Sequence, residues 1–248
     1  MDFKNKVVLI TGASRGIGKA IAIEFAKRGS NIVINYNDSE NEALKLKKYI
    51  VSNYQTQVLV IKADVSNEME VKKMVTKTIE EFSRIDILIN NAGIAIDTIF
   101  EDKTVSNFRK ILDTNLIGTF LVSKYVSKYM LDQKYGKIIN ISSTNGIDTY
   151  YPYSMDYDAS KAGVISLTKN LAVELSPYIN VNSIAPGWVN TEMNKELDEE
   201  YIKEESKKIL LNRFAEPSEI AKVAVFLASD DASYINGDII RVDGGVNK

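Results

Sequence analysis

The sequence predicts an α/β fold of the Rossmann type, with a doubly wound parallel sheet of about seven strands and helices on both faces. Short apolar runs alternate along the chain with longer segments of helical periodicity. A glycine-rich turn follows the first apolar run directly. Such strand–helix alternation implies right-handed crossovers and a parallel sheet that is covered on both sides.

The first strand is expected at residues 6–11 (KVVLIT), an apolar run with polar ends that is typical of a buried parallel strand. In the helix that follows, Ile17, Ile21 and Phe25 recur on one face, and Gly29 stands where the helix would end. Further strands are expected at residues 31–35, 58–61, 85–90, 137–142, 181–185 and 239–242. Further helices are expected at about 39–53, 68–83, 105–131, from the Tyr157 region to about 176, and at 217–229.

Nothing in the sequence divides the chain, so residues 1–248 are expected to form one dinucleotide-binding and catalytic domain. The exception to the alternation is a charged helical insertion at 192–212, which is longer than an ordinary connection. We interpret the segment at about 190–212 as a substrate lid.

Composition narrows the chemistry. With 45% hydrophobic and 26% charged residues and a net charge of −2, the chain resembles ordinary globular proteins, with no electrostatic reason to bind nucleic acid or an anionic membrane. No apolar run approaches a membrane span and no signal-peptide core precedes the first strand, so a cytoplasmic location is expected. There is no cysteine and no histidine. Thiolate nucleophiles, Cys-based zinc sites and imidazole catalysis are therefore excluded, and no metal site is expected.

Tyr157 and Lys161 are four residues apart, the spacing at which side chains meet on a helix. A tyrosine has an ordinary pKa of about 10, but a nearby ammonium favours the phenolate. A shift of about three units needs roughly 4 kcal/mol, which a close charge in a partly dry site can supply. The pair predicts proton transfer, although the same spacing also occurs by chance at surfaces.

The glycine-rich turn at residues 12–18 (GASRGIG) lies between an expected strand and an expected helix. Its glycines allow close approach of a pyrophosphate, and the helix N-terminus offers free N–H groups. The candidate cofactor-binding residues in this turn are Gly12, Ser14, Arg15, Gly16, Ile17 and Gly18.

Two later turns also follow strands. Asp64 and Val65 follow the third strand, where the carboxylate either contacts an adenine amino group or caps the next helix. Asn91, Ala92 and Gly93 follow the fourth strand, where small residues leave room for a cofactor.

These motifs, with Asn115, Ser143, the Tyr157–Lys161 pair and the Pro186-Gly187 turn, resemble the short-chain dehydrogenase/reductase family in order and spacing over essentially the whole chain. The resemblance is closest to the branch with bacterial 3-oxoacyl-acyl-carrier-protein reductases.

The resemblance implies a role for each catalytic candidate. Tyr157 would transfer the substrate proton, and Lys161 would lower its pKa and hold the ribose. Ser143 would bind the carbonyl oxygen, and Asn115 would position a relay water. Ser142 and Ser143 are adjacent, and only one can face the site because side chains alternate along a strand.

The resemblance also implies cofactor contacts after the sixth strand. Pro186, Gly187 and Val189 would lie at the nicotinamide, and Thr191 would lie near the phosphates. Trp188 and the aromatic segment 149–155 are either pocket wall or packing of the lid and its loop.

NADP(H) is favoured over NAD(H). Enzymes that use NAD commonly place a carboxylate at the end of the second strand, but this chain has Tyr36 there. Arg15 can reach a 2′-phosphate.

The expected substrate is a small carbonyl compound, with a 3-oxoacyl thioester of fatty acid biosynthesis favoured by the resemblance. Lys134 and Lys137 are available to dock an acidic carrier protein, but the turn at 176–179 lacks an arginine and the lid is acidic. A small ketone, a sugar or a steroid-like alcohol therefore remains an alternative, and a non-catalytic dinucleotide sensor is a remote one. The resemblance also implies a homotetramer.

Overall fold

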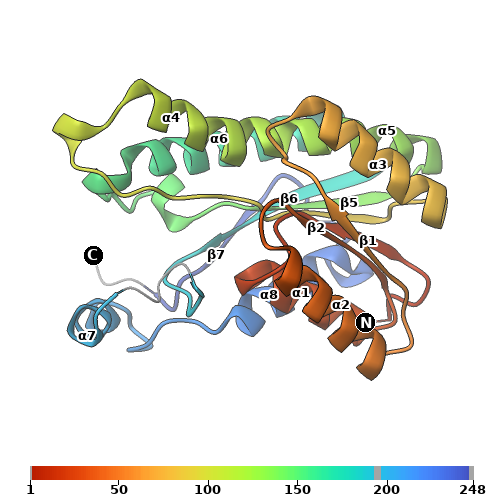
Figure 1. The fold of residues 1–248 in the computed structure, drawn as a ribbon, viewed down its shortest axis with the longest axis horizontal. Helices are drawn as coiled ribbons and strands as arrows, with labels where there is room; N and C mark the ends of the chain where they lie inside the picture. Colours follow the sequence, from red (N-terminus) through yellow and green to blue (C-terminus); the bar gives the residue numbers. More distant parts are fainter. Residues whose placement is uncertain (1, 193–196, 246–248) are drawn as a thin grey trace.

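The computed structural model describes residues 2–192 and 197–245. Within them, seven parallel strands form one sheet in the order β3-β2-β1-β4-β5-β6-β7 (Figure 1). The order reverses between β1 and β4, which are neighbours, and ligands bind at such a reversal beyond the carboxyl ends of the strands. The strands are β1 Val7–Ile10, β2 Asn31–Tyr36, β3 Val58–Lys62, β4 Ile87–Asn90, β5 Gly136–Ile141, β6 Ile179–Pro186 and β7 Ile239–Val242.

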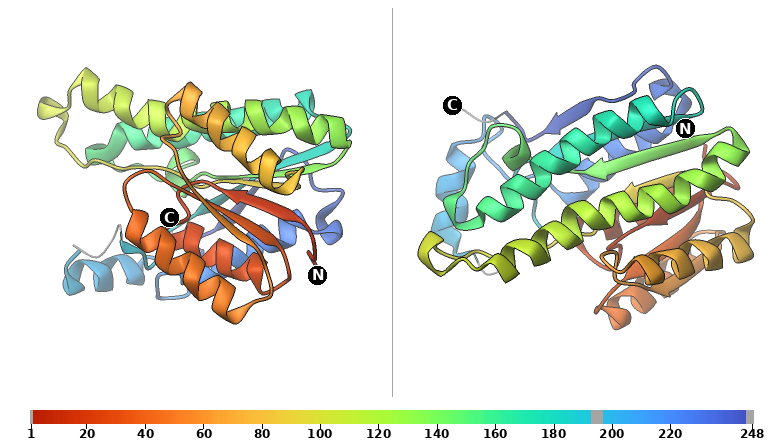
Figure 2. Two further views of the ribbon diagram at one scale, coloured as in Figure 1. Left: turned by 45° about the vertical axis from the view of Figure 1, so that its right-hand side comes forward. Right: turned by 90° about the horizontal axis from the view of Figure 1, so that it is seen from above.

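Helices cover both faces of the sheet, as the views in Figures 1 and 2 show. One face carries α1 Gly16–Ala26, α2 Glu40–Asn53 and α8 Pro217–Ala228. The other carries α3 Glu68–Phe82, α4 Val105–Leu112, α5 Gly118–Gln133 and α6 Met155–Glu174. A further helix, α7 Glu199–Lys207, lies outside these two layers. The predicted fold class is confirmed.

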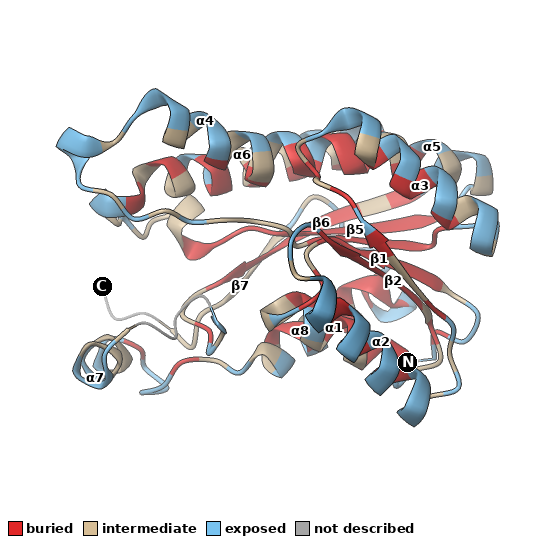
Figure 3. Ribbon diagram, viewed as in Figure 1, coloured by how far each residue is buried: buried red, intermediate tan, exposed pale blue. Residues whose placement is uncertain are grey.

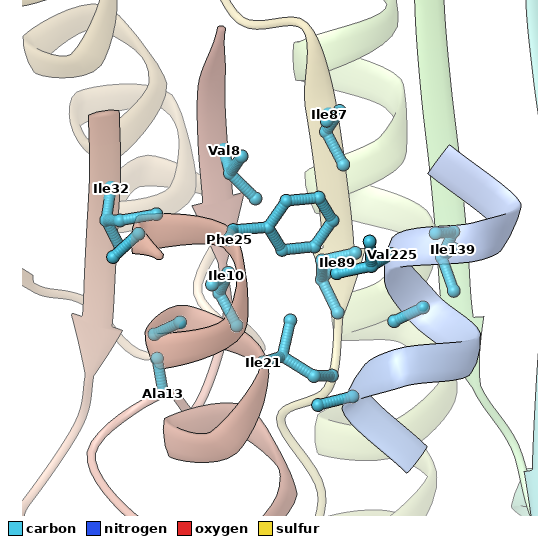
Figure 4. Close-up of a cluster of buried hydrophobic side chains, with 14 of the residues drawn as sticks. Val8, Ile10, Ala13, Ile21, Phe25, Ile32, Ile87, Ile89, Ile139 and Val225 are labelled. Atoms are coloured by element: carbon cyan, nitrogen blue, oxygen red, sulfur yellow. The ribbon is translucent and has the colours of Figure 1, made fainter. Parts of the chain in front are cut away.

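The inner strands β1, β2, β4, β5 and β6 are largely buried, whereas the edge strands β3 and β7 are partly exposed (Figure 3). Apolar side chains pack on both faces of the sheet. Under α1 and α8, Phe25 packs with Ile10 and Ile89 of adjacent strands (Figure 4). Phe3 meets Phe25 edge to face, with ring centroids 5.1 Å apart. A second buried cluster fills the layer under α3, α5 and α6.

The helix expected at 105–131 is two helices, so that prediction was wrong in one respect. A π-helical turn, Asp113–Ile117, separates α4 from α5. The apolar periodicity continues across the turn, and a single inserted residue in a helix leaves no gap in such a pattern. The π-helical turn contains Asn115, so it forms part of the candidate site.

The proposed lid at about 190–212 includes α7. This helix begins after Asp198, and the Asp198 carboxylate accepts a hydrogen bond from the Tyr201 amide at 2.6 Å. Residues 193–196 of this segment lie outside the described residues. The segment after α7 is tied to the turn after β7, because the amides of Leu210 and Leu211 donate to the carbonyls of Gly245 and Gly244. The lid and the single-domain division stay predictions.

Within the part of the chain that the structure describes, no helix has the length and apolar character needed to cross a membrane.

Candidate active site

The turns after β1 and β4 are locked together at the reversal point of the sheet. The Asn91 side chain donates to the carbonyls of Thr11 and Gly12, both at 2.9 Å. The Thr11 hydroxyl accepts from the amides of Asn91 at 2.9 Å and Ala92 at 3.0 Å. Asn91 therefore shapes the glycine-rich turn.

This packing leaves no room for side chains at two glycines. A Cβ on Gly12 would lie 2.9 Å from the Cα of Ala92. A Cβ on Gly18 would lie 2.5 Å from the Asn91 side-chain nitrogen and 2.6 Å from the Gly12 carbonyl oxygen. Both glycines are required by close approach between the two turns.

The start of α1 fits a phosphate group. Arg15 precedes the helix without a side-chain hydrogen bond to its first turn, which leaves N–H groups for an anion. Gly16 has a positive φ of 54°, and a Cβ there would lie 3.5 Å from the Thr191 methyl carbon. Thr191 and the glycine-rich turn, both predicted phosphate contacts, therefore lie side by side. Ser14 and Ile17 belong to the same turn, where Ser14 is buried.

Tyr157 and Lys161 lie on the first two turns of α6. The Lys161 ammonium is 5.4 Å from the centroid of the Tyr157 ring and donates to the Ile141 carbonyl at 2.8 Å. This second contact anchors the lysine to the end of β5.

Burial acts on both groups of the pair. It raises the pKa of Tyr157 to about 12, with an added contribution from the Asp158 charge, while a hydrogen bond with Ser143 works in the opposite direction. It lowers the pKa of Lys161 to about 8. The resemblance implied that Lys161 lowers the Tyr157 pKa, whereas the largest influence here is burial, which raises it. At neutral pH, Tyr157 is a protonated acid.

Ser142 and Ser143 point in different directions. Ser142 is held within the sheet, where its hydroxyl donates to the Ile184 carbonyl at 3.0 Å and accepts from Ser183 at 2.7 Å. The Ser143 hydroxyl instead turns toward the Tyr157 phenol and accepts from the Asn145 amide at 3.2 Å.

Asn115 is buried beside the same group. Its side-chain oxygen accepts from the Ile94 amide at 2.8 Å, and its nitrogen donates to the Ile94 carbonyl and the Ser160 hydroxyl, each at 3.0 Å. A Cβ on Gly93 would lie 3.3 Å from the Asn115 side-chain oxygen and 3.5 Å from the Lys161 nitrogen. Asn115 thus fixes the chain after β4 close to Lys161, and its role at a relay water stays a prediction.

Asp64 and Val65, the candidate cofactor contacts after β3, both make contacts within the protein. Asp64 accepts hydrogen bonds from the Ser66 amide at 2.9 Å and hydroxyl at 2.7 Å, so it stabilises a turn, whereas Asn67 is the N-cap of α3. A contact of Asp64 with adenine stays a prediction. Val65 is buried against Gly118, where a Cβ would be 2.7 Å from a Val65 methyl carbon.

Tyr36 lies at the end of β2 and is largely buried. Its hydroxyl donates to the Glu40 carboxylate at 3.0 Å. Arg15, across the turn after β1, is exposed.

The segment after β6 joins the site to the lid. Pro186 ends β6, and a Cβ on Gly187 would lie 2.8 Å from the Cβ of Asp243. Val189 is buried. The Trp188 ring stacks on Phe214 at 5.2 Å between centroids and meets Tyr201 of α7 edge to face at 6.1 Å. Of the two interpretations of Trp188, these contacts favour lid packing.

Two contacts near the site could not be read from the sequence. Tyr151, in the aromatic segment 149–155, forms a hydrogen bond with Tyr201, which connects the loop before α6 to α7. Lys103 forms an ion pair with Asp156, at 2.9 Å, beside Tyr157. No motif in the sequence pairs residues so far apart, although an acidic residue on each side of Tyr157 was visible.

The known proteins that resemble this chain are reductases and short-chain dehydrogenases. A family model described as enoyl-(acyl carrier protein) reductase matches residues 12–247. A 3-oxoacyl-acyl-carrier-protein reductase of Synechocystis sp. is 43% identical over 243 residues, which cover 97% of this chain and 96% of that protein. The crystal structure of levodione reductase is 38% identical with a TM-score of 0.93, covering 98% of both chains. A short-chain type dehydrogenase/reductase from Mycobacterium marinum is 36% identical with the same TM-score, covering 98% of this chain and 96% of its own.

Gly18→Ala should weaken NADPH binding by about tenfold or more, because the new methyl group would force apart the two turns that shape the phosphate site. Fluorescence titration of NADPH with the purified protein measures this. Ala20→Gly, on the same helix, is the matched control and should leave the dissociation constant within about twofold, since it costs only helix stability. Equal binding by the Gly18→Ala variant and the wild type would contradict the assignment.

Proposed function

The chain belongs to the short-chain dehydrogenase/reductase family, and we propose that it reduces the carbonyl of a 3-oxoacyl thioester to a secondary alcohol with NADPH. The observation that carries this proposal is the grouping of Tyr157 with Ser143 and Lys161, next to the Gly93 turn that packs on the glycine-rich turn. The 3-oxoacyl-acyl-carrier-protein reductase from Synechocystis supports the substrate class.

The nicotinamide supplies the hydride, so the chain need only orient the ketone and provide a proton. Ser143 donates a hydrogen bond to the carbonyl oxygen, where negative charge develops. Tyr157 gives its proton to that oxygen as the alcohol forms. Lys161 stabilises the phenolate that remains and binds the ribose, and Asn115 positions the water through which Tyr157 is reprotonated.

The remaining predicted contacts belong to the same proposal. The residues that would hold the phosphates are Gly12, Ser14, Gly16, Ile17, Gly18 and Thr191. Those that would hold the adenosine are Arg15, Tyr36, Asp64 and Val65. Those that would hold the nicotinamide are Asn91, Ala92, Gly93, Pro186, Gly187 and Val189.

The thioester proposal does not depend on carrier docking at Lys134 and Lys137. Lys137 is buried and its ammonium donates to Asn180 at 2.8 Å, so the expectation that it is available was wrong. Its side chain is covered because it lies within β5 rather than in a loop. Both lysines lie at the amino end of β5, opposite the end that carries Ser143.

A second candidate is a small cyclic ketone. It is favoured by the likeness to levodione reductase and by the aromatic rings of Trp188, Tyr201 and Tyr151 at the lid. A turnover screen with NADPH that compares acetoacetyl thioesters with cyclic ketones separates the two candidates.

We also expect a homotetramer. Helices α4, α5 and α6 leave apolar side chains on the outer face, among them Val105, Phe120 and Val173, which a partner subunit can cover. The cytoplasmic location stays a prediction.

Tyr157→Phe should lower kcat for acetoacetyl thioester reduction by about a thousandfold, because the proton donor is removed. NADPH affinity should stay within about twofold, since the ring is kept. The measurements are NADPH oxidation followed by absorbance and a separate binding titration. Tyr234→Phe, at a fully exposed tyrosine, is the control and should retain wild-type turnover. Unchanged turnover in Tyr157→Phe would remove Tyr157 from its role.

With one ketone substrate, kcat/KM should be higher for NADPH than for NADH, because Arg15 is exposed beside the phosphate turn. Arg15→Gln should lower the NADPH-to-NADH ratio of kcat/KM by about tenfold. Lys19→Gln, an exposed cation on the same helix, should change that ratio little. A wild-type preference for NADH would rule out the cofactor assignment.

The rate of reduction should fall above about pH 8. Burial lowers the pKa of Lys161 to about 8, so the ammonium loses its proton there, whereas Tyr157, with a pKa of about 12, stays protonated. The profile of kcat/KM against pH measures this decline. In Lys161→Arg the charge persists at high pH, so a slower enzyme without the decline is expected. A wild-type profile that is flat through this range would contradict the assignment to Lys161.

A further inference from the structure

Two carboxylates flank the proposed proton donor in the sequence, Asp156 before Tyr157 and Asp158 after it. Neither has a role in the reaction described above. Each of them contacts a different loop at the carboxyl edge of the sheet.

Asp156 holds the loop between β4 and α4. Its side chain is fully buried and lies 2.9 Å from the Lys103 ammonium, which is itself 4% exposed. The same oxygen accepts a hydrogen bond from the Tyr157 amide at 3.0 Å. Lys103 also donates to the Ile96 carbonyl at 3.4 Å. One carboxylate oxygen therefore joins this loop to the backbone of Tyr157.

A buried ion pair with few other partners is sensitive to the loss of either member. The second oxygen of Asp156 is buried and has no hydrogen-bond partner among the described residues. Without Lys103, the carboxylate would be left as an unpaired buried charge. This ion pair is thus a buried attachment of the loop next to Tyr157, in addition to the hydrogen bonds that Asn115 makes with Ile94.

Asp158 holds the loop between β5 and α6. One of its oxygens accepts from the Asn145 side chain at 2.7 Å, and the other accepts from the Tyr151 amide at 3.0 Å. Asn145 in turn hydrogen-bonds to the Ser143 hydroxyl through both its amide and its side-chain oxygen. A chain of hydrogen bonds therefore leads from Asp158 to Ser143.

The two loops also meet each other. The Thr98 amide of the first loop donates to the Tyr153 carbonyl of the second at 2.9 Å. Since Tyr151 hydrogen-bonds to Tyr201, the second loop also contacts the lid helix. Both loops thus border the place where a substrate must lie to reach Tyr157.

We propose that Asp156 and Asp158 are positioning residues, each of which ties one loop bordering the site to the helical turn that carries Tyr157. Asp156 acts through Lys103 on residues 94–104, and Asp158 acts through Asn145 on Ser143. The expected effect on kcat rests on the proposed reduction. The expected effect on the loops rests on the hydrogen bonds alone.

Hydrogen–deuterium exchange tests the structural part without any substrate. Lys103→Met should speed exchange in residues 94–104, and Asp158→Asn should speed it in residues 143–151. Each variant should affect its own loop by about tenfold and the other loop much less. Asp132→Asn, at an exposed aspartate on α5, is the matched control and should alter neither loop. Unchanged exchange in both loops would overturn the proposal.

Kinetics test the functional part, with the carbonyl compound that the wild type reduces best. Lys103→Met and Asp158→Asn should each lower kcat by about tenfold to a hundredfold, because Tyr157 or Ser143 is then misplaced. The affinity for NADPH should stay within about twofold of the wild type. Lys103→Arg, which keeps the charge, should recover most of kcat.

The double variant Lys103→Met/Asp156→Asn separates positioning from simple stability. It leaves no unpaired charge, so its thermal midpoint should return toward that of the wild type. Its kcat should stay low, because the tie is still missing. If kcat recovers in the double variant together with the midpoint of thermal unfolding, the positioning role is overturned. The same holds if kcat is unaffected in both Lys103→Met and Asp158→Asn. Failure of the wild type to reduce any thioester would refute the proposed function instead and leave the exchange result intact.

Discussion

The contact between the turn after β1 and the turn after β4 is the constraint on which the rest of the site depends. Asn91 and Thr11 join the two turns with four hydrogen bonds, and Gly12 and Gly18 allow the backbones to approach. This contact lies between β1 and β4, where the strand order reverses and where ligands bind in sheets of this kind. We propose that the nicotinamide cofactor binds there, within reach of the proton-transfer group on α6.

A second constraint is the removal of Tyr157 and Lys161 from water. Burial moves the two pKa values apart, the phenol upward and the ammonium downward, because removal from water favours the neutral form of each group. A phenol that keeps its proton is ready to donate in reduction, whereas the opposite direction first requires its removal. The proposed reduction uses that protonated form.

Much of this arrangement could be predicted from the sequence, because it follows from local patterns. Apolar runs gave the strands, and the spacing of Tyr157 and Lys161 gave their common helix face. The remainder depends on contacts between distant segments. Asn115 lies in a π-helical turn that periodicity cannot detect, Lys103 meets Asp156 only in the fold, and Lys137 is covered by packing around β5. The direction of the Tyr157 pKa shift was also out of reach, since it depends on burial rather than on the spacing to Lys161.

The backbone pairing of Leu210 and Leu211 with Gly245 and Gly244 has a consequence for synthesis of the chain. The glycine-rich turn, Tyr157 and Lys161 all precede α7 in the sequence, so the ribosome makes them first. The two hydrogen bonds that fix the segment after α7 cannot form until residue 245 has left the ribosome. That segment therefore gains these native contacts only near the end of translation.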